Sequence, residues 1–303
     1  MGSPEATRFA EFLESLSARI GASDQGLGTV RDICESLHLA GAEPEGVTYA
    51  EVDANGVAAM WAIPEGASGE HALVHFHMGG TVVASMHSDR KAAGHIAKAA
   101  GVRSLIVDFR RSPENPYPAQ VDDALAAFEW VVAQGYQPAH IGSVGHSVGG
   151  FLAVMLALTL RDQGKEQPGA ILSISPWCDL EIGNDDIVAK ADSDKLLSKP
   201  LLELFRQCWL GGTGISYTDP RVSLLHADLA GLAPTSLHWG EAEILAGEAV
   251  AFGERLVEAG VDVRIRPLAD GQHSFVIAGG RVPEVDEEIA GMGIWLREKL
   301  GVK

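Results

Sequence analysis

The sequence predicts an α/β fold with a mostly parallel sheet, helices on both faces and a helical cap. Strand-like runs begin near residue 46 and, after a hairpin, alternate with helical runs; such alternation is typical of parallel strands joined by right-handed crossovers. The first forty residues have a helical pattern and precede any strand-like run. The alternation stops over residues 179–233, and an insertion of that length with helix of its own favours a lid.

Composition limits the class of protein. With 303 residues, 46% of them hydrophobic, the chain can bury a large core. The net charge of -18 repels phosphate backbones and anionic membrane surfaces, which argues against nucleic-acid partners. Neither a secretory leader nor a run of about 18 apolar residues is visible, so we expect a cytoplasmic protein without stable membrane insertion. Cys34, Cys178 and Cys208 are widely spaced, which predicts buried free thiols.

The N-terminal half of the chain begins with helices and a hairpin. Phe9, Leu13, Leu16 and Ile20 share one helical face, and Val30, Ile33 and Leu37 share another. The next two runs, 47–52 and 57–63, flank an Asn-Gly pair, a strong signal for a tight hairpin turn. An antiparallel start to the sheet is therefore expected.

Strands and helices then follow in alternation. The expected strands are 72–77, 104–109, 140–144, 170–175, 235–239 and 261–267. The expected helices are 88–100, 121–134, 148–161, 245–259 and 283–300, with a further helical run over 196–210 inside the insertion. We divide the chain into an N-terminal part of the cap (1–45), a first core part (46–180), a cap insertion (181–225) and a second core part (226–303).

Residues 145–150, Gly-His-Ser-Val-Gly-Gly, lie between an expected strand and an expected helix. Their G-x-S-x-G spacing is typical of a nucleophile elbow, where small residues let strand and helix approach while a tight turn exposes the serine hydroxyl. Ser147 is the predicted nucleophile. On this motif alone, a glycine-softened turn with an ordinary serine remains an alternative.

A serine nucleophile needs a base, an acid that orients the base, and donors for the oxyanion. His273 follows an expected strand, at the carboxyl end where a base should lie. Glu243 lies just after strand 235–239 and is the chosen acid; Glu241, Glu248 and Asp270 are rivals, because carboxylates at helix starts are common.

The run 77–80, His-Met-Gly-Gly, follows another apolar strand. Adjacent glycines at a strand end can turn their N–H groups outward. The N–H groups of Gly79, Gly80 and Val148 would together form an oxyanion hole, whereas a simple glycine turn is the alternative. His77 is expected to shape this loop by hydrogen bonding rather than to take part in the chemistry.

These motifs occur in one order along the chain, together with Asp-Phe-Arg-Arg-Ser-Pro-Glu-Asn-Pro-Tyr-Pro-Ala at 108–119 and later landmarks at 175–180, 219–223, 228–234 and 271–275. Together they resemble the bacterial hormone-sensitive-lipase-like family of α/β-hydrolase carboxylesterases. The resemblance implies the α/β-hydrolase fold, with eight strands and a helical cap. It also implies a Ser147–Glu243–His273 triad and a structural brace behind the oxyanion loop, formed by Asp108 and Arg110.

Three positions depart from the family pattern. Met78 replaces the first glycine of the oxyanion loop, although the two donor glycines are retained. Glu243 stands where Asp is commoner, which is similar to the minority branch that includes monoterpene-lactone hydrolases. His146 replaces the usual Asp of the elbow, and we interpret it as a neutral surface residue.

The predicted function is hydrolysis of small to medium uncharged carboxylic esters or lactones by a serine carboxylesterase, with no metal or organic cofactor. Amide or carbamate hydrolysis by the same triad is one alternative. A ligand-binding receptor on this fold is another, against which His273 argues. Family likeness suggests a homodimer through the last strand and helix. The residues Leu201, Leu204, Phe205 and Trp209 are candidates to line the pocket, although an apolar stripe of this kind also fits a core helix.

Overall fold

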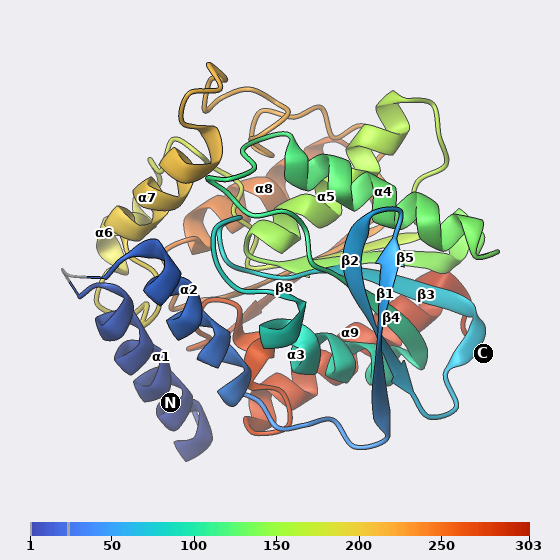
Figure 1. Cartoon of the computed structure of the whole chain (residues 1–303), viewed down its shortest axis with the longest axis horizontal. Helices are drawn as coiled ribbons and strands as arrows, with labels where there is room; N and C mark the ends of the chain where they lie inside the picture. Colours follow the sequence, from blue (N-terminus) through green and yellow to red (C-terminus); the bar gives the residue numbers. More distant parts are fainter. Residues whose placement is uncertain (1, 23–24) are drawn as a thin grey trace.

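The computed structural model describes residues 2–22 and 25–303, which form one eight-stranded sheet between two layers of helices (Figure 1). The strand order is β1-β2-β4-β3-β5-β6-β7-β8. The strands are β1 (Val47–Ala54), β2 (Val57–Pro64), β3 (Ser68–Phe76), β4 (Val102–Val107), β5 (Ile141–His146), β6 (Ala170–Ile174), β7 (Thr235–Gly240) and β8 (Val263–Leu268).

The sheet is mostly parallel, as predicted. Strand β2 runs antiparallel to both of its neighbours, β1 and β4, and every other pairing is parallel. The hairpin between β1 and β2 closes on Asn55 and Gly56, with φ values of 59° and 86°. A positive φ at both central residues is what a type I′ turn requires, so the Asn-Gly signal is confirmed.

Helices cover both faces of the sheet. Figure 1 shows α4, α5 and α8 on one side and α3 and α9 on the other. The helical elements are α1 (Pro4–Ile20), α2 (Leu27–Glu35), η1 (Ser36–Leu39), α3 (Met86–Ala100), α4 (Ala119–Ala133), η2 (Pro138–His140), α5 (Val148–Asp162), α6 (Asp186–Ala189), α7 (Lys199–Leu210), α8 (Ala246–Glu258), η3 (Phe275–Ala278) and α9 (Pro283–Leu300).

Helix α7 begins later than the apolar run predicts. The run starts at residue 196, whereas the helix begins at Lys199, directly after Ser198, whose hydroxyl accepts a hydrogen bond from the Leu201 N–H. The N–H groups of Leu196 and Leu197 donate instead to the buried Asp194 carboxylate. Side-chain acceptors therefore set the start of this helix, which hydrophobic periodicity does not report.

The N-terminal helices lie beside the inserted segment. In Figure 1, α1 and α2 are adjacent to α7, at the end of the sheet where β5 leads into α5. The Ser17 hydroxyl donates to the Leu196 carbonyl at 3.1 Å, and Lys195 forms an ion pair with Glu14 at 3.2 Å. Two segments far apart in the sequence thus cover the same edge of the sheet.

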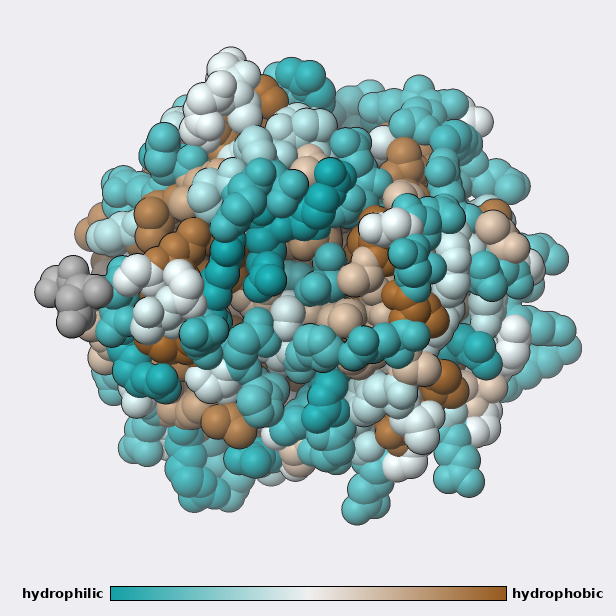
Figure 2. All heavy atoms as spheres, viewed as in Figure 1, coloured by the Kyte–Doolittle hydropathy of each residue, from teal (hydrophilic) through white to brown (hydrophobic). Residues whose placement is uncertain are grey.

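The surface is largely polar. Figure 2 shows hydrophilic residues over most of one face, with apolar residues in small separate groups. Among the described residues, no helix has the length and apolar character needed to cross a membrane. The predicted cytoplasmic location and homodimer stay predictions.

Candidate active site

Ser147 occupies a sharp turn between β5 and α5. Its backbone has φ 58° and ψ −128°, a conformation that L-residues rarely adopt and that costs about 1–3 kcal/mol. Hydrogen bonds on the β6 side hold the turn: the Ser147 N–H donates to the Ile174 carbonyl at 2.9 Å, and the Trp177 N–H donates to the Ser147 carbonyl at 3.2 Å. The strained geometry is that of the predicted elbow.

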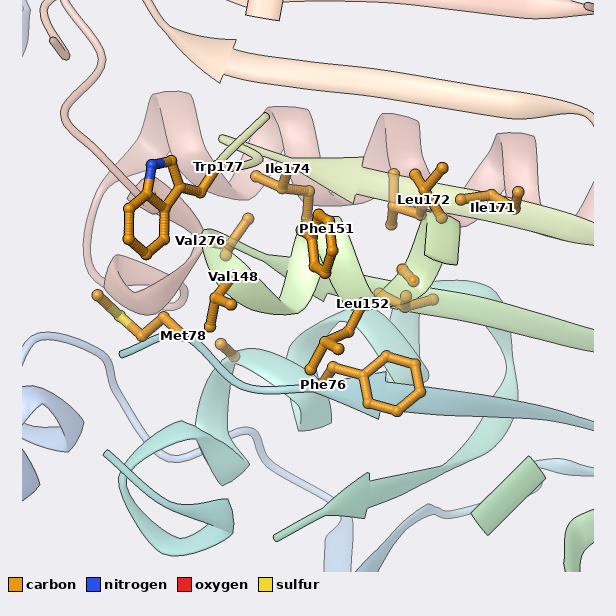
Figure 3. Close-up of a cluster of buried hydrophobic side chains, with 14 of the residues drawn as sticks. Phe76, Met78, Val148, Phe151, Leu152, Ile171, Leu172, Ile174, Trp177 and Val276 are labelled. Atoms are coloured by element: carbon orange, nitrogen blue, oxygen red, sulfur yellow. The ribbon is translucent and has the colours of Figure 1, made fainter. Parts of the chain in front are cut away.

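The glycines around Ser147 are required by close contact. A Cβ atom on Gly145 would lie 2.2 Å from the Gly149 carbonyl oxygen, and one on Gly149 would lie 2.0 Å from the Phe76 carbonyl oxygen. Strand and helix can approach this closely only without those side chains. Figure 3 shows the apolar cluster beside the turn, where Phe151 of α5 lies near Ile174 of β6.

His273 and Glu243 form a buried pair, although they lie 30 residues apart in the sequence. The His273 Nδ1 is 2.5 Å from the Glu243 Oε2, and Oε1 of the same carboxylate accepts the Gly240 N–H at 3.1 Å. Burial raises the pKa of Glu243, and the neighbouring His273 partly offsets that rise. The His273 Nε2 is buried and has no hydrogen-bond partner among the described residues, so the hydroxyl of Ser147 is not bonded to it in this structure.

The structure separates the rival acids from His273. Glu241 and Asp270 are exposed. Glu248 is buried, but its Oε1 accepts the Cys178 N–H at 2.7 Å, and its Oε2 accepts from Asn184. Glu243 is thus the candidate acid that the structure places on His273.

The loop after β3 presents free backbone donors. Gly79 has φ 115° and Gly80 has φ 58°, and the Gly79 carbonyl accepts the N–H groups of Val82 and Val83, which closes a tight turn. Within the described part of the chain, the N–H groups of Gly79, Gly80 and Val148 donate to no acceptor. These N–H groups are therefore available for an oxyanion.

Two arginines that the sequence reasoning missed support this loop. The Arg31 Nε donates to the Val82 carbonyl at 2.9 Å, and Arg111 donates to the Ala84 carbonyl at 3.2 Å. Asp108 accepts the Met86 N–H at 3.0 Å, in keeping with its predicted role as a brace. Arg110 differs from the prediction, because its guanidinium pairs with Asp123 on α4.

His77 shapes the loop in the way the sequence indicated. Its ring stacks on Phe109 at 4.0 Å between centroids, and its Nδ1 donates to the Met78 carbonyl at 2.6 Å. Burial lowers the pKa of His77, which favours the neutral imidazole. The side chain is fully buried and does not line the pocket that Ser147 faces.

A pocket opens beside Ser147, and no charged residue of the described chain lines it. Residues of α1, α2 and the inserted segment form one wall, and the loop after β3 forms another. The lining residues are Leu16, Ile20, Cys34, Leu37, Met78, Gly79, Gly80, Val83, Ser147, Trp177, Leu196, Leu197, Leu201, Leu202 and Phe205.

Only part of the predicted stripe on α7 reaches this pocket. Leu201 and Phe205 line it, together with Leu202. Trp209 is instead a core residue, whose Nε1 donates to the Gln120 side chain at 3.0 Å, and Leu204 is 49% exposed. The alternative interpretation as a core helix is therefore correct for Trp209.

The prediction for His146 is wrong. It was expected at the surface, but its side chain is fully buried, and its Nε2 lies 2.7 Å from the Asp89 Oδ1. His146 is the last residue of a central strand, where both faces of the sheet are covered by helices. Of the three free thiols, Cys34 and Cys178 are buried as predicted, whereas Cys208 is partly exposed.

Comparisons with known proteins agree with this architecture. The family model described as "alpha/beta hydrolase fold" matches residues 73–277. An acetyl-hydrolase from Streptomyces hygroscopicus is 32% identical over 80% of this chain and 80% of its own length. An ethyl acetate hydrolase from Pseudomonas putida is 33% identical over 71% and 69%. A crystal structure of an esterase from the bacterial hormone-sensitive lipase family covers 99% of this chain and 100% of its own, with 32% identity and a TM-score of 0.93.

The chain therefore belongs to the α/β-hydrolase family. The predicted fold class and the resemblance to hormone-sensitive-lipase-like esterases are confirmed, and so is the predicted class of enzyme, an ester hydrolase.

Proposed function

We propose that the protein is a serine carboxylesterase that hydrolyses small to medium uncharged carboxylic esters or lactones, with Ser147 as nucleophile, His273 as base and Glu243 as acid. The observation that carries this proposal is the strained serine of the elbow at an apolar pocket, flanked by free N–H donors and by a buried His–Glu pair.

Glu243 fixes the tautomer of the base. With Nδ1–H donating to the carboxylate, the buried Nε2 of His273 carries the lone pair. In the acylation step, Ser147 Oγ bonds to the carbonyl carbon while Nε2 takes the hydroxyl proton. That proton then passes to the alcohol oxygen as the ester bond breaks. Water repeats the sequence on the acyl-enzyme and releases the acid.

The oxyanion hole would stabilise the negative charge that develops on the carbonyl oxygen of the substrate. The N–H groups of Gly79, Gly80 and Val148 would donate to the carbonyl oxygen as it becomes negative in both tetrahedral intermediates. Each such donor is typically worth about 3 kcal/mol in the barrier. Because Gly79 and Gly80 both have positive φ, glycine suits both positions, and Met78 precedes them without replacing a donor.

The pocket favours uncharged substrates. A carboxylate or ammonium group in an apolar cavity without a partner would lose its hydration, so esters and lactones with apolar substituents fit best. The relatives named acetyl-hydrolase and ethyl acetate hydrolase support small acyl groups. Segments 1–45 and 181–225 would act as the cap, since α1 and α7 both contribute walls.

The test uses Ser147→Ala beside Ser143→Ala, a matched change of a buried serine on β5, the strand that leads into the turn. Turnover of p-nitrophenyl butyrate and covalent labelling by a fluorophosphonate should both be lost in Ser147→Ala and retained in Ser143→Ala. Labelling without ester turnover, but with turnover of an anilide, would favour the amide hydrolase instead. A wild-type protein that is not labelled would favour a binding function, and retained turnover in folded Ser147→Ala would refute the nucleophile.

A further inference from the structure

A buried cluster of His75, Asp89 and His146 lies directly behind the serine turn. The His75 Nε2 is 2.6 Å from the Asp89 Oδ2, and the His146 Nε2 is 2.7 Å from the Asp89 Oδ1. Both histidines are fully buried, and Asp89 is 2% exposed. The ester hydrolysis proposed above makes no use of these three side chains.

The strand register explains why they meet. His75 on β3 pairs with Val144 on β5, and His146 follows Val144 by two residues. Side chains two apart on a strand share one face of the sheet, so both imidazoles project toward the same helix layer. Asp89 lies in the first turn of α3, where the partial positive charge of the helix start favours a carboxylate.

The hydrogen bonds define the protonation of the cluster. Burial alone would raise the pKa of Asp89, but the two histidines outweigh it and hold that pKa well below its usual range. Burial lowers the pKa of His146, although Asp89 opposes this. The Nδ1 atoms of both histidines are buried without a partner, which suits an unprotonated nitrogen better than an N–H donor. The cluster is therefore one carboxylate that accepts hydrogen bonds from the Nε2 atoms of two buried histidines.

The same three residues have the composition of a metal site, with ligand atoms within 4.8 Å of one another. Binding a cation through both Nε2 atoms would force the proton of each ring onto its Nδ1. Both Nδ1–H groups would then be buried donors without an acceptor among the described residues. The hydrogen-bonded carboxylate explains the arrangement without that cost.

His146 links this cluster to the serine. It is the residue immediately before Ser147 and the last residue of β5. On the β6 side, backbone hydrogen bonds to Ile174 and Trp177 hold the strained turn. On the α3 side, the strand end is held by the hydrogen bond from His146 to Asp89. The turn is thus fastened to elements on both sides.

We propose that Asp89 and His146 are positioning residues for Ser147. The Asp89 carboxylate fixes the imidazole of His146 and, through it, the strained backbone that aims the hydroxyl. This inference rests on the proposed function, because it assigns a role in presenting the same nucleophile. His75 is the second donor to the carboxylate, and it lies on β3, outside the β5–α5 turn.

The chain offers a matched pair for the test. His146→Leu and His75→Leu each remove one donor from the same carboxylate, so a role in stability alone predicts equal effects. We expect similar falls in thermal stability for both variants. We also expect a loss of kcat of about 10–100-fold on p-nitrophenyl butyrate for His146→Leu, with KM within about threefold, and a loss of less than about threefold for His75→Leu. The rate of fluorophosphonate labelling should fall in parallel with kcat.

His146→Gln provides the rescue, because the amide nitrogen of glutamine can occupy the position of the imidazole Nε2 and donate to Asp89. It should retain kcat within about threefold of wild type. Asp89→Asn replaces His146→Leu if the latter does not fold, with the same loss of kcat expected. Equal losses of kcat in the two leucine variants, or no recovery in His146→Gln, would overturn the proposal. So would a stoichiometric metal ion in the wild-type protein that His146→Leu lacks. If the wild type itself is not labelled at Ser147, it is the esterase proposal that fails.

Discussion

The two glycines of the proposed oxyanion loop, Gly79 and Gly80, should respond differently to replacement by alanine. A Cβ atom on Gly79 would lie 2.0 Å from the backbone carbonyl oxygen of Val83. A Cβ atom on Gly80 would lie 2.1 Å from the Cδ2 atom of Phe205, which is part of a cap side chain. The clash with the Val83 carbonyl can be relieved only if the loop backbone moves. The clash with the Phe205 ring can be removed by a second mutation at Phe205.

The size of each effect follows from these contacts. Ordinary contact begins at 3.4 Å, so Gly79→Ala requires a displacement of 3.4 − 2.0, about 1.4 Å, and its φ of 115° lies outside the regions open to alanine. A shift of about 1 Å at a reacting group costs on the order of 10²-fold, as does the loss of one oxyanion donor. We expect kcat to fall about 10²–10³-fold. At Gly80, a φ of 58° costs alanine about 1–2 kcal/mol. The clash between the new Cβ atom and the Phe205 ring adds a second cost to Gly80→Ala.

The assay is kcat/KM for p-nitrophenyl butyrate in two double-mutant cycles with Phe205→Ala. Phe205→Ala should restore Gly80→Ala at least about tenfold, equivalent to a coupling of about 1.4 kcal/mol. It should leave Gly79→Ala unchanged within about twofold. Equal rescue of the two variants, or rescue of Gly79→Ala alone, would refute this reading of the loop.

Three further predictions concern groups around the site. Glu243→Gln should lower kcat about 10³-fold, because a neutral amide neither fixes the tautomer of His273 nor stabilises its imidazolium; the exposed Glu241→Gln is the control and should change nothing. Burial raises the pKa of the Cys34 thiol to about 12, so this thiol stays protonated at pH 8. Iodoacetamide at pH 8 should therefore modify the partly exposed Cys208 first and leave activity intact. Early modification of Cys34, detected by mass spectrometry, would contradict this. Arg31→Leu should lower kcat several-fold and thermal stability slightly, since the Val82 and Ser112 carbonyls lose their donor, whereas Arg8→Leu on the exposed face of α1 should have no effect on kcat.

Local chemistry explains which parts of the site were predictable. The G-x-S-x-G spacing indicates Ser147 because side chains at its two glycines would clash with nearby backbone. A Cβ atom on Gly145 would meet the Gly149 carbonyl, and one on Gly149 would meet the Phe76 carbonyl of β3. The Asn-Gly hairpin is predictable for the same reason. Each of these signals is a short run of residues whose spacing can be recognised in the sequence itself.

His146 shows where that reasoning ends. Its partner, Asp89, lies 57 residues away on another element, so nothing in the local pattern distinguishes a buried, paired imidazole from one at the surface. Helix α7 shows a second limit. Leu201, Leu204, Phe205 and Trp209 fit one apolar stripe, but the buried face contains Leu202 in place of Leu204, because the packing of the cap sets the rotation of the helix.

The links between the cap and the proposed triad are a third kind of feature that periodicity cannot reveal. Asp194 of the inserted segment is buried and accepts the Ile244 N–H at 2.9 Å, next to Glu243. Gln272, next to His273, accepts the Lys195 N–H at 2.8 Å and donates to the Ser193 carbonyl at 3.0 Å. The segment that leads into α7 is therefore hydrogen-bonded to the loops of both Glu243 and His273. These hydrogen bonds join segments about 50 and 77–79 residues apart in the sequence, which no periodic pattern could bring together.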